Sequence, residues 1–356
     1  MKKESYINYI NYTIDTYNKT NKKALLELFE DEKIAKKKNE QTNLFDKDAI
    51  DIDYNNIENT IMECINNNTK AIEIYEKYQF TKSYKYAALC KCEQFEELLN
   101  EIEKIEEYKY NDEVKIYDVL KEPTKIVTSE NIIIVFNKKF EAIHPQTADE
   151  LLLHYPIAVV VHLEKKLVEL RFDTIKRVFT EGERDQAIYI KQVCEVLDYF
   201  KKEYNIELKP LELDFMLEVI KDDNNENIKL VSQCMNMANG SKAQLMVGNN
   251  EEYVLPIIGE LKNIISELRE ELDKNLKIKD ALEQFIYEKE ETTDYPWIEV
   301  VFLNEEGIKT RNNNVKFTFN YMNQNYTLIT YYYNNTLIGM ERMNDVSRFI
   351  GENIKE

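Results

Sequence analysis

The first 122 residues of the chain contain no glycine and no proline, and the first glycine of the whole sequence is Gly182. Because glycine and proline interrupt helices more than other residues do, a segment without them favours long helical stretches. Apolar residues in this segment recur at helical spacing, for example at Tyr6, Ile10 and Ile14. We therefore predict a helical domain over residues 1–115, with the clearest helical pattern between 71 and 110.

The seven glycines also limit the kinds of site that the chain can form. No two of them lie close enough in sequence to make the turn with which a dinucleotide-binding fold or a P-loop approaches a phosphate. Only three histidines are present, and neither they nor the five cysteines have the spacing of a zinc site or of a nucleophile motif. We expect no metal site and no cofactor.

Beyond residue 115 the pattern changes to short β-rich segments. Two hairpins are predicted, the first with its turn at 137–139 and the second with its turn at 164–166. The hairpins, a covering helix and three further strands are expected over residues 132–143, 156–172, 183–203, 206–213, 230–235 and 243–247. Residues 116–250 are therefore predicted to form a central antiparallel α+β domain.

The third predicted domain, residues 251–356, begins with a long helix over 257–288. Its apolar residues follow a nearly heptad-spaced seam, formed by Leu261, Ile265, Leu268, Leu272 and Leu276. Four strands and a closing helix are expected after it, over 297–303, 315–321, 326–333, 336–340 and 341–354. The fold class is thus α+β, with a helical N-terminal domain followed by antiparallel sheet units with covering helices and one long acidic helix.

The charge balance limits the partners that the chain can bind. The sequence has 47 Lys and Arg against 66 Asp and Glu, a net charge of −19. This excess disfavours a protein that coats nucleic acid or an anionic membrane. The chain has no apolar run of about 18 residues and no N-terminal stretch resembling a signal peptide, and its five cysteines are odd in number. We expect a cytoplasmic protein with reduced thiols and no membrane contact.

One arrangement of carboxylates suggests a nuclease. Restriction-type nucleases place an Asp before one strand and Glu-x-Lys on the next, so that two carboxylates hold Mg²⁺. Here Asp149 precedes the second hairpin, and Glu169 and Arg171 share one face of its last strand. However, arginine stays protonated and cannot act as a base. We favour a surface ion pair on a solvated face, with Mg²⁺ as cofactor only in the nuclease alternative.

The last fifty residues are less acidic than the rest, with six basic against four acidic side chains. A turn centred on 323–324 would pair Tyr321 with Tyr326 and so place Lys316, Tyr331 and Tyr333 on one exposed face. Together with Arg342 and Arg348, these residues are candidates for binding single-stranded nucleic acid by stacking and phosphate contacts. Ordinary packing and a protein interface are the alternatives, and packing is favoured.

The acidic excess concentrates between 251 and 306, where 16 acidic side chains stand against 6 basic ones. A solvated face is the simplest explanation, and a docking surface for a basic partner, with the leucine seam as its apolar part, is the alternative. We predict a non-enzymatic scaffold or adaptor that binds a protein partner or itself through the long helix. The Lys-rich, Arg-poor composition suggests an AT-rich bacterial genome, and hence a mobile-element or phage-defence complex. A nucleic-acid-acting protein and an acidic DNA-mimic inhibitor are the other classes considered.

Overall fold

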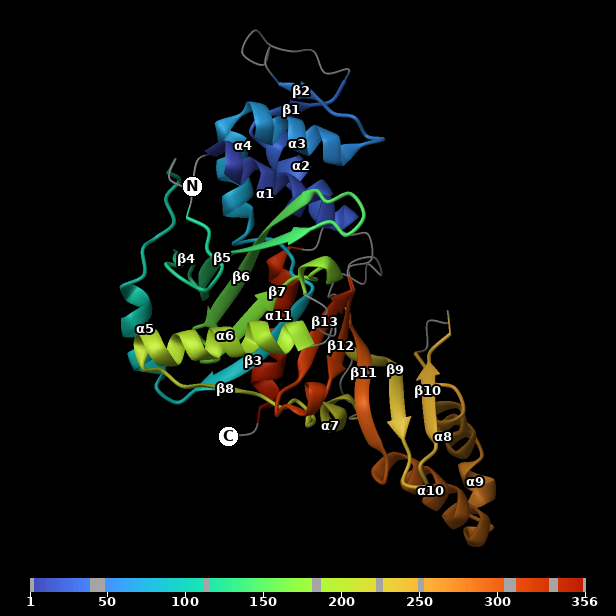
Figure 1. The fold of residues 1–356 in the computed structure, drawn as a ribbon. Coiled ribbons are helices and arrows are strands. Elements are labelled where there is room, and N and C mark those ends of the chain that lie inside the picture. The colour runs from blue at the N-terminus through green and yellow to red at the C-terminus, as the bar shows by residue number, and fades with distance from the viewer. Residues whose placement is uncertain are drawn as a thin grey trace. The chain divides into compact units, whose positions relative to one another are not determined.

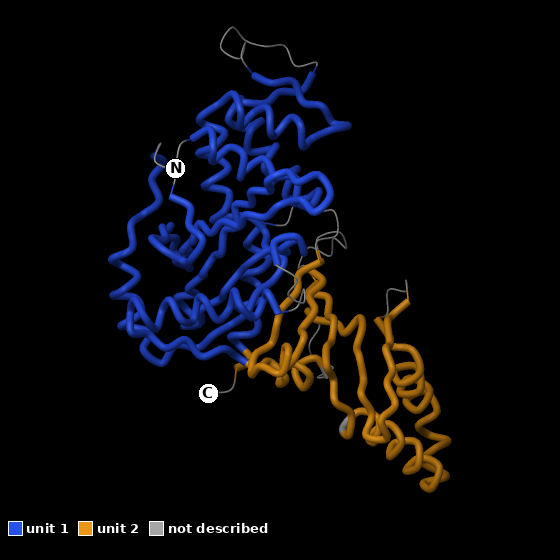
Figure 2. Tube along the Cα trace, viewed as in Figure 1, with its two compact units in different colours: residues 1–211, 333–352 blue, residues 212–332, 353–356 orange. Residues whose placement is uncertain are grey.

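A computed structural model describes residues 3–38, 49–111, 115–180, 187–221, 227–248, 253–303, 312–332 and 339–354 (Figure 1). The chain divides into two compact units (Figure 2). Unit 1 comprises residues 1–211 and 333–352, and unit 2 comprises residues 212–332 and 353–356. Each unit combines helices with an antiparallel sheet, which confirms the α+β class. None of the described helices has the length and apolar content needed to cross a lipid bilayer.

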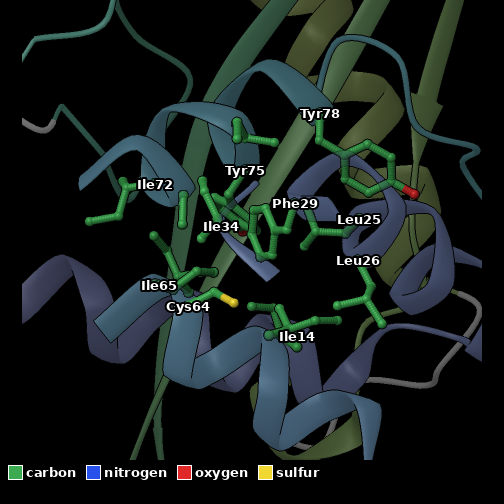
Figure 3. Packing of buried hydrophobic residues seen from close by; sticks show 14 of the residues in the cluster. Ile14, Leu25, Leu26, Phe29, Ile34, Cys64, Ile65, Ile72, Tyr75 and Tyr78 are labelled. Atoms are coloured by element: carbon green, nitrogen blue, oxygen red, sulfur yellow. The ribbon is translucent and has the colours of Figure 1, made fainter. Parts of the chain in front are cut away.

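Unit 1 begins with four helices that enclose an apolar core. Their bounds are α1 Lys3–Thr16, α2 Lys19–Asp31, α3 Ile57–Asn67 and α4 Thr69–Tyr78, and a short parallel pair, β1 Ala35–Lys36 and β2 Ile50–Asp51, lies between α2 and α3. Asparagine side chains cap three of the helices, as Asn18, Asn56 and Asn68 each accept a hydrogen bond from a backbone amide of the first turn. Ile14, Phe29 and Ile65 are among the residues that meet in the core (Figure 3).

The rest of unit 1 is built on an antiparallel sheet with strand order β3-β7-β6-β5-β4, and β8 pairs with the other edge of β3. Its elements are β3 Tyr86–Cys92, α5 Phe95–Glu103, β4 Thr124–Val127, β5 Asn131–Ile143, β6 Glu150–His162, β7 Leu167–Phe172, a 3₁₀ turn Arg177–Phe179, α6 Ala187–Tyr204, β8 Leu208–Pro210 and α11 Met340–Asn353. The predicted hairpin over 156–172 is confirmed as β6 and β7, and the predicted helices near 183–203 and 341–354 are confirmed as α6 and α11.

Alternation along β7 assigns α6 and α11 to opposite faces of this sheet. The Phe172 ring stacks on Tyr189 of α6, with 5.9 Å between ring centroids. Glu169 has the opposite parity on the strand, and its carboxylate accepts a hydrogen bond from Ser347 of α11. The sheet is therefore covered on both sides, which explains why all six residues of β7 are buried.

Two predictions for unit 1 are wrong. Residues 86–92, expected to be helical, form β3, because a short apolar run such as Ala87 to Cys90 is compatible with a buried strand as well as with a helix.

The turn expected at 137–139 is absent, and β5 continues through it, paired with β6 from Asn131 to Ile143. The polar side chains there have partners within the fold, since Lys138 bonds Gln192 and Glu195 of α6. Because β3 joins the sheet of the expected second domain, the two units also differ from the three expected domains.

Unit 2 contains an antiparallel sheet with strand order β10-β9-β11-β12-β13. Its elements are α7 Met216–Lys221, β9 Ile228–Asn236, β10 Lys242–Met246, α8 Ile258–Glu267, α9 Arg269–Leu272, α10 Leu276–Glu291, β11 Asp294–Phe302, β12 Asn313–Thr318, a 3₁₀ turn Tyr321–Asn323 and β13 Leu328–Tyr332. The expected single helix over 257–288 is wrong. The segment Asp273–Asn275 interrupts it, so that α8 and α10 form a helical hairpin.

The pairing of β12 with β13 differs from the prediction by one residue. Val315 faces Tyr331, and Lys316 faces Thr330. The turn between the strands contains Asn320, Met322 and Asn323 at positive φ. With this turn, one strand has one residue more than in a simple hairpin, and the pairing shifts by one position. Because a slip of one residue turns every side chain to the other face, Tyr331 lies in the core beside Val315 instead of on the exposed face.

Candidate functional site

Glu169 and Arg171 lie on one face of β7, as predicted, but that face is covered by α11. Arg171 Nη2 lies 2.6 Å from Glu169 Oε2 and donates a second bond of 2.7 Å to Asn344 Oδ1. The same carboxylate oxygen accepts a 2.6 Å hydrogen bond from Ser347 Oγ and lies 2.8 Å from His162 Nε2. We call Glu169, Arg171, His162, Asn344 and Ser347 the buried ion cluster.

The cluster keeps Glu169 ionised in spite of its burial. Both Glu169 and Arg171 have 0% exposure, so neither is the solvated surface residue that the sequence predicted. Burial alone would raise the pKa of Glu169, but the Arg171 charge and the hydrogen bonds from His162 and Arg171 outweigh it and lower the pKa to about 2. A carboxylate held in this way stabilises the contact between α11 and the sheet.

The nuclease arrangement is not assembled. Asp149 is exposed in the turn before β6, whereas Val160, the β6 residue that faces Glu169, lies eleven positions further along the strand. At about 3.3 Å per residue the two carboxylates are roughly 35 Å apart, too far to share a metal ion. A depression lined in part by His162 and Asn344 has a volume of about 20 Å³, enough for roughly one water molecule and not for a substrate.

The candidates for nucleic-acid binding are not brought together either. In unit 2, Lys316 lies over the Trp297 ring with its Nζ 3.7 Å from the centroid, and burial lowers its pKa. Tyr331 has 0% exposure, and Tyr333 lies outside the described residues. Arg342 and Arg348 belong to α11 of unit 1, where both pair with carboxylates, including that of Asp345. The described residues therefore do not form the predicted stacking surface.

The predicted seam residues lie on the helical hairpin of unit 2, and none of them is buried. Leu268 and Leu276 are exposed, and Leu261, Ile265 and Leu272 are half-buried. Ile264, Ile278, Phe285 and Tyr287 of the hairpin are also exposed. On α10, Leu276 and Tyr287 lie on the side of the helix opposite Ile278 and Phe285. We call Ile264, Leu268, Ile278 and Phe285 the hairpin surface. Ile264 of α8 and Leu268, the C-cap residue of α8, are one turn apart, and Ile278 and Phe285 of α10 are two turns apart, so each pair follows one side of its helical segment.

Carboxylates surround the hairpin surface. Some are engaged within the hairpin, such as Glu290, which accepts from Lys262 at 2.8 Å. Five exposed carboxylates of the hairpin form no ion pair among the described residues: Glu260, Glu267, Glu270, Asp280 and Glu288. Three basic residues, Arg269, Lys277 and Lys289, form no ion pair among those residues either. The hairpin thus combines exposed apolar side chains with an excess of unpaired negative charge.

A cleft in unit 1, which the sequence did not reveal, has a volume of about 780 Å³. Tyr6 of α1, Phe80 and Tyr108 contribute aromatic walls, and Glu76 of α4 lies in the lining between them. The Tyr108 hydroxyl donates a 2.8 Å hydrogen bond to Glu76 Oε2. The lining is completed by residues of α5, of the segment that precedes β4, of β5 and of α6. Because this cleft needs several segments that are distant in sequence, only the fold assembles it.

Burial changes the acidity of the groups in this cleft. Desolvation raises the pKa of Glu76 to about 7, although hydrogen bonds from Tyr108 and Tyr6 act in the opposite direction. His154 lies behind Tyr6, with ring centroids 5.6 Å apart, and burial lowers its pKa to about 3, so its ring is neutral. Glu76 is therefore a carboxyl group that changes charge near neutral pH, a property that is frequent in ligand-binding and catalytic sites.

Comparison with family models, with curated proteins and with solved structures gives no match. The function therefore has to be argued from the residues and their geometry.

Proposed function

We propose that the protein is a non-enzymatic adaptor that binds a partner protein through the hairpin surface of unit 2. The observation that supports this proposal is the incomplete burial of the helical hairpin. Among the described side chains of α8, α9 and α10, only Ile258 and Ile286 are buried. Helices of this length are marginal in water by themselves, because most helical stability in proteins comes from packing an apolar face. A partner that covers the hairpin surface would supply that packing.

The proposed occupant is a basic amphipathic helix of another protein. Such a helix would present apolar residues to Ile264, Leu268 and Phe285, and its Lys or Arg residues to the neighbouring carboxylates. The charge argues against a second copy of this chain, because an isologous contact would bring Glu267 and Glu270 close to the same acidic groups of the other copy. Exposed apolar side chains also distinguish this surface from a purely acidic DNA mimic.

The energy available from this contact can be worked out from the exposures. Ile264, Leu268 and Phe285 are 49%, 49% and 44% exposed. Burying a whole side chain of this kind contributes about 1.5–3 kcal/mol, so covering the exposed half contributes about 1 kcal/mol each. Replacing all three with serine should therefore weaken binding by about 3 kcal/mol, or roughly 100-fold.

The test is a comparative pull-down from the native host, with nuclease treatment of half the sample, followed by a binding measurement. The bait is the full chain, as wild type, as Ile264→Ser/Leu268→Ser/Phe285→Ser, or as the control Val127→Ser/Ile143→Ser, whose side chains are exposed in unit 1. We then select a protein that the wild type and the control capture but the hairpin variant does not. A synthetic peptide with the sequence of its basic helix is used for the titration. We expect titration with that peptide to show the 100-fold loss and to weaken with salt.

Three results would contradict the proposal. The first is a set of captured proteins that is the same for the hairpin variant and the wild type, with unfolding midpoints also unchanged. The second is capture that disappears after nuclease treatment, which would indicate a nucleic-acid bridge. The third is a concentration-dependent dimer in light scattering that the hairpin variant abolishes, since that would make a second copy the occupant.

A further inference from the structure

We propose that the cleft of unit 1 binds a small organic ammonium compound, with the carboxylate of Glu76 as its charged partner. This site is independent of the hairpin surface and does not rest on the adaptor proposal. A volume of about 780 Å³ lies within the range of clefts that hold small-molecule ligands, roughly 300–1,000 Å³.

The balance of charge in the lining favours a cation. Five glutamates and three lysines line the cleft. Two of the lysines are neutralised locally, because Lys104 lies 2.7 Å from Glu101 Oε1 and Lys115 lies 3.0 Å from Glu122 Oε2. Among the other charged residues of the lining, three are acidic, Glu76, Glu106 and Glu107, and one is basic, Lys109. An incoming cation would find net negative charge, and an anion would be repelled.

The aromatic walls favour an organic cation over a metal ion. Tyr6, Phe80, Tyr108 and Tyr204 line the cleft. Tyr6 and Phe80 are only 1% and 2% exposed, so the half-buried rings of Tyr108 and Tyr204 offer most of the accessible aromatic surface. Aromatic faces attract ammonium groups, and cages of aromatic rings with a carboxylate are a recurrent way to bind quaternary and alkylated ammonium ligands. Phe80 and Tyr108 pack together with centroids 5.4 Å apart, which fixes one wall. A small, strongly hydrated metal ion gains little from such walls.

Binding should be coupled to the ionisation of Glu76. Its pKa of about 7 means that the carboxyl group is partly protonated at neutral pH, and an ammonium group nearby favours the ionised form. Affinity should therefore fall as the pH is lowered from 8 to 6, and binding near pH 7 should release a fraction of a proton. The titratable groups that act on Glu76 are Tyr108 from the segment after α5, Tyr6 from α1 and Glu73 from α4 itself.

The groups on the opposite wall do not change this expectation. The hydrogen bond from Tyr117 and the ion pair with Lys115 lower the pKa of Glu122 to about 2, and burial raises the pKa of Tyr204 of α6. The tyrosines at Glu76 also have raised pKa values, chiefly because they are buried. They stay protonated over the range in which Glu76 titrates.

The experiment is calorimetric titration of the full chain with three probes at pH 6, 7 and 8. The probes are choline, spermidine and 3,3-dimethylbutan-1-ol, the last being the uncharged isostere of choline. We expect at least one of the two ammonium probes to bind more tightly than the neutral alcohol, with an affinity that rises with pH. Repeating the titration in buffers of different ionisation enthalpy measures the proton that is released.

Two variants separate the cleft from unspecific charge effects. Glu76→Gln keeps the size of the side chain and an acceptor for Tyr108, and we expect it to weaken ammonium binding roughly tenfold at pH 8 and to remove the pH dependence. Glu97→Gln, an exposed carboxylate of α5 outside the cleft lining, is the matched control and should bind as the wild type does. The proposal is overturned if neither ammonium probe saturates, if the alcohol binds equally well, or if Glu76→Gln leaves affinity and pH dependence unchanged.

Discussion

The buried ion cluster allows a quantitative test of what attaches α11 to the sheet of unit 1. Glu169→Gln keeps the shape of the side chain but removes the negative charge that faces Arg171. The guanidinium then loses the Glu169 charge while it stays buried, because both side chains have 0% exposure. Breaking one partner of a buried ion pair typically costs about 3–5 kcal/mol.

Proton linkage gives the same order of magnitude. The pKa of Glu169 is about 2, against 4.5 for an ordinary glutamate. Each unit corresponds to about 1.4 kcal/mol, so the ionised form contributes about 3 kcal/mol to the free energy of unfolding. Because this pKa is lowered in the folded state, the contribution is fully present above about pH 4.5 and is lost as the pH falls from there towards 2.

The assay is urea unfolding followed by far-UV circular dichroism at several pH values between 7 and 3. Trp297, the single tryptophan, belongs to unit 2, and its fluorescence is recorded alongside to report that unit separately. We expect Glu169→Gln to lower the free energy of unfolding by about 3 kcal/mol at pH 7. The difference from wild type should then shrink as the pH falls below 4.5, since the wild-type carboxylate becomes neutral as well.

Two comparisons decide whether the reasoning holds. The double variant Glu169→Gln/Arg171→Met removes both charges but keeps an acceptor for Ser347 and His162, so it should recover part of the lost stability. Asp149→Asn, at an exposed position, should behave as the wild type does. The electrostatic account would be refuted by a Glu169→Gln variant whose stability lies within about 0.5 kcal/mol of wild type at pH 7, or by a difference that does not change with pH.

Three further predictions concern other buried groups. Tyr331→Ala should lower the free energy of unfolding of unit 2 by about 3 kcal/mol, measured by Trp297 fluorescence in urea, whereas Tyr287→Ala, which is 58% exposed, should not. Since the pKa of Glu76 is raised, the folded state loses stability as the pH rises from 4.5 through 7, so Glu76→Gln should raise the unfolding midpoint at pH 8 and not at pH 4. The His154 ring should keep constant NMR shifts between pH 5 and 8, because its pKa is about 3.

Several elements could be predicted because one periodic pattern fits them. The apolar residues Tyr6, Ile10 and Ile14 lie on one buried stripe of α1, and the helical period detects such a stripe directly. The β6–β7 hairpin has two apolar runs separated by a short polar turn, which is the simplest strand signal. In both cases the local sequence contains the whole of the evidence that the fold uses.

The errors occur where distant residues decide the outcome. Asn137 and Lys138 resemble a turn, but Gln192 and Glu195 of α6 satisfy Lys138 within a strand, and those partners are more than fifty residues away. The register of β12 and β13 depends on positive φ at Asn320 and its neighbours, which no hydrophobic pattern encodes.

In the candidate sites too, the local sequence predicts some features, and residues distant in sequence decide the others. Strand alternation correctly placed Glu169 and Arg171 on one face, yet their burial depends on Ser347 and Asn344, more than 170 residues later in the chain. Likewise, Glu76 lies within the segment 71–110 that was predicted to be helical, but its hydrogen-bond partner Tyr108 is 32 residues away across β3 and α5. Sequence periodicity identifies a face, and only the fold determines what covers it.

The net charge of −19 therefore has no single meaning, because glutamates in this chain occupy three different environments. Glu169 is buried beside a cation, which lowers its pKa to about 2, so its charge serves stability. Glu76 is partly buried, and desolvation raises its pKa to about 7, so its charge changes near neutral pH. Glu267 and Glu270 are exposed beside exposed apolar side chains, and under the adaptor proposal their charge would favour a basic partner. The role of a carboxyl group in this chain thus depends on how far it is desolvated and on the charge of the group that faces it. The variants at Glu169, Glu76 and the hairpin surface should therefore differ in their response to pH and salt.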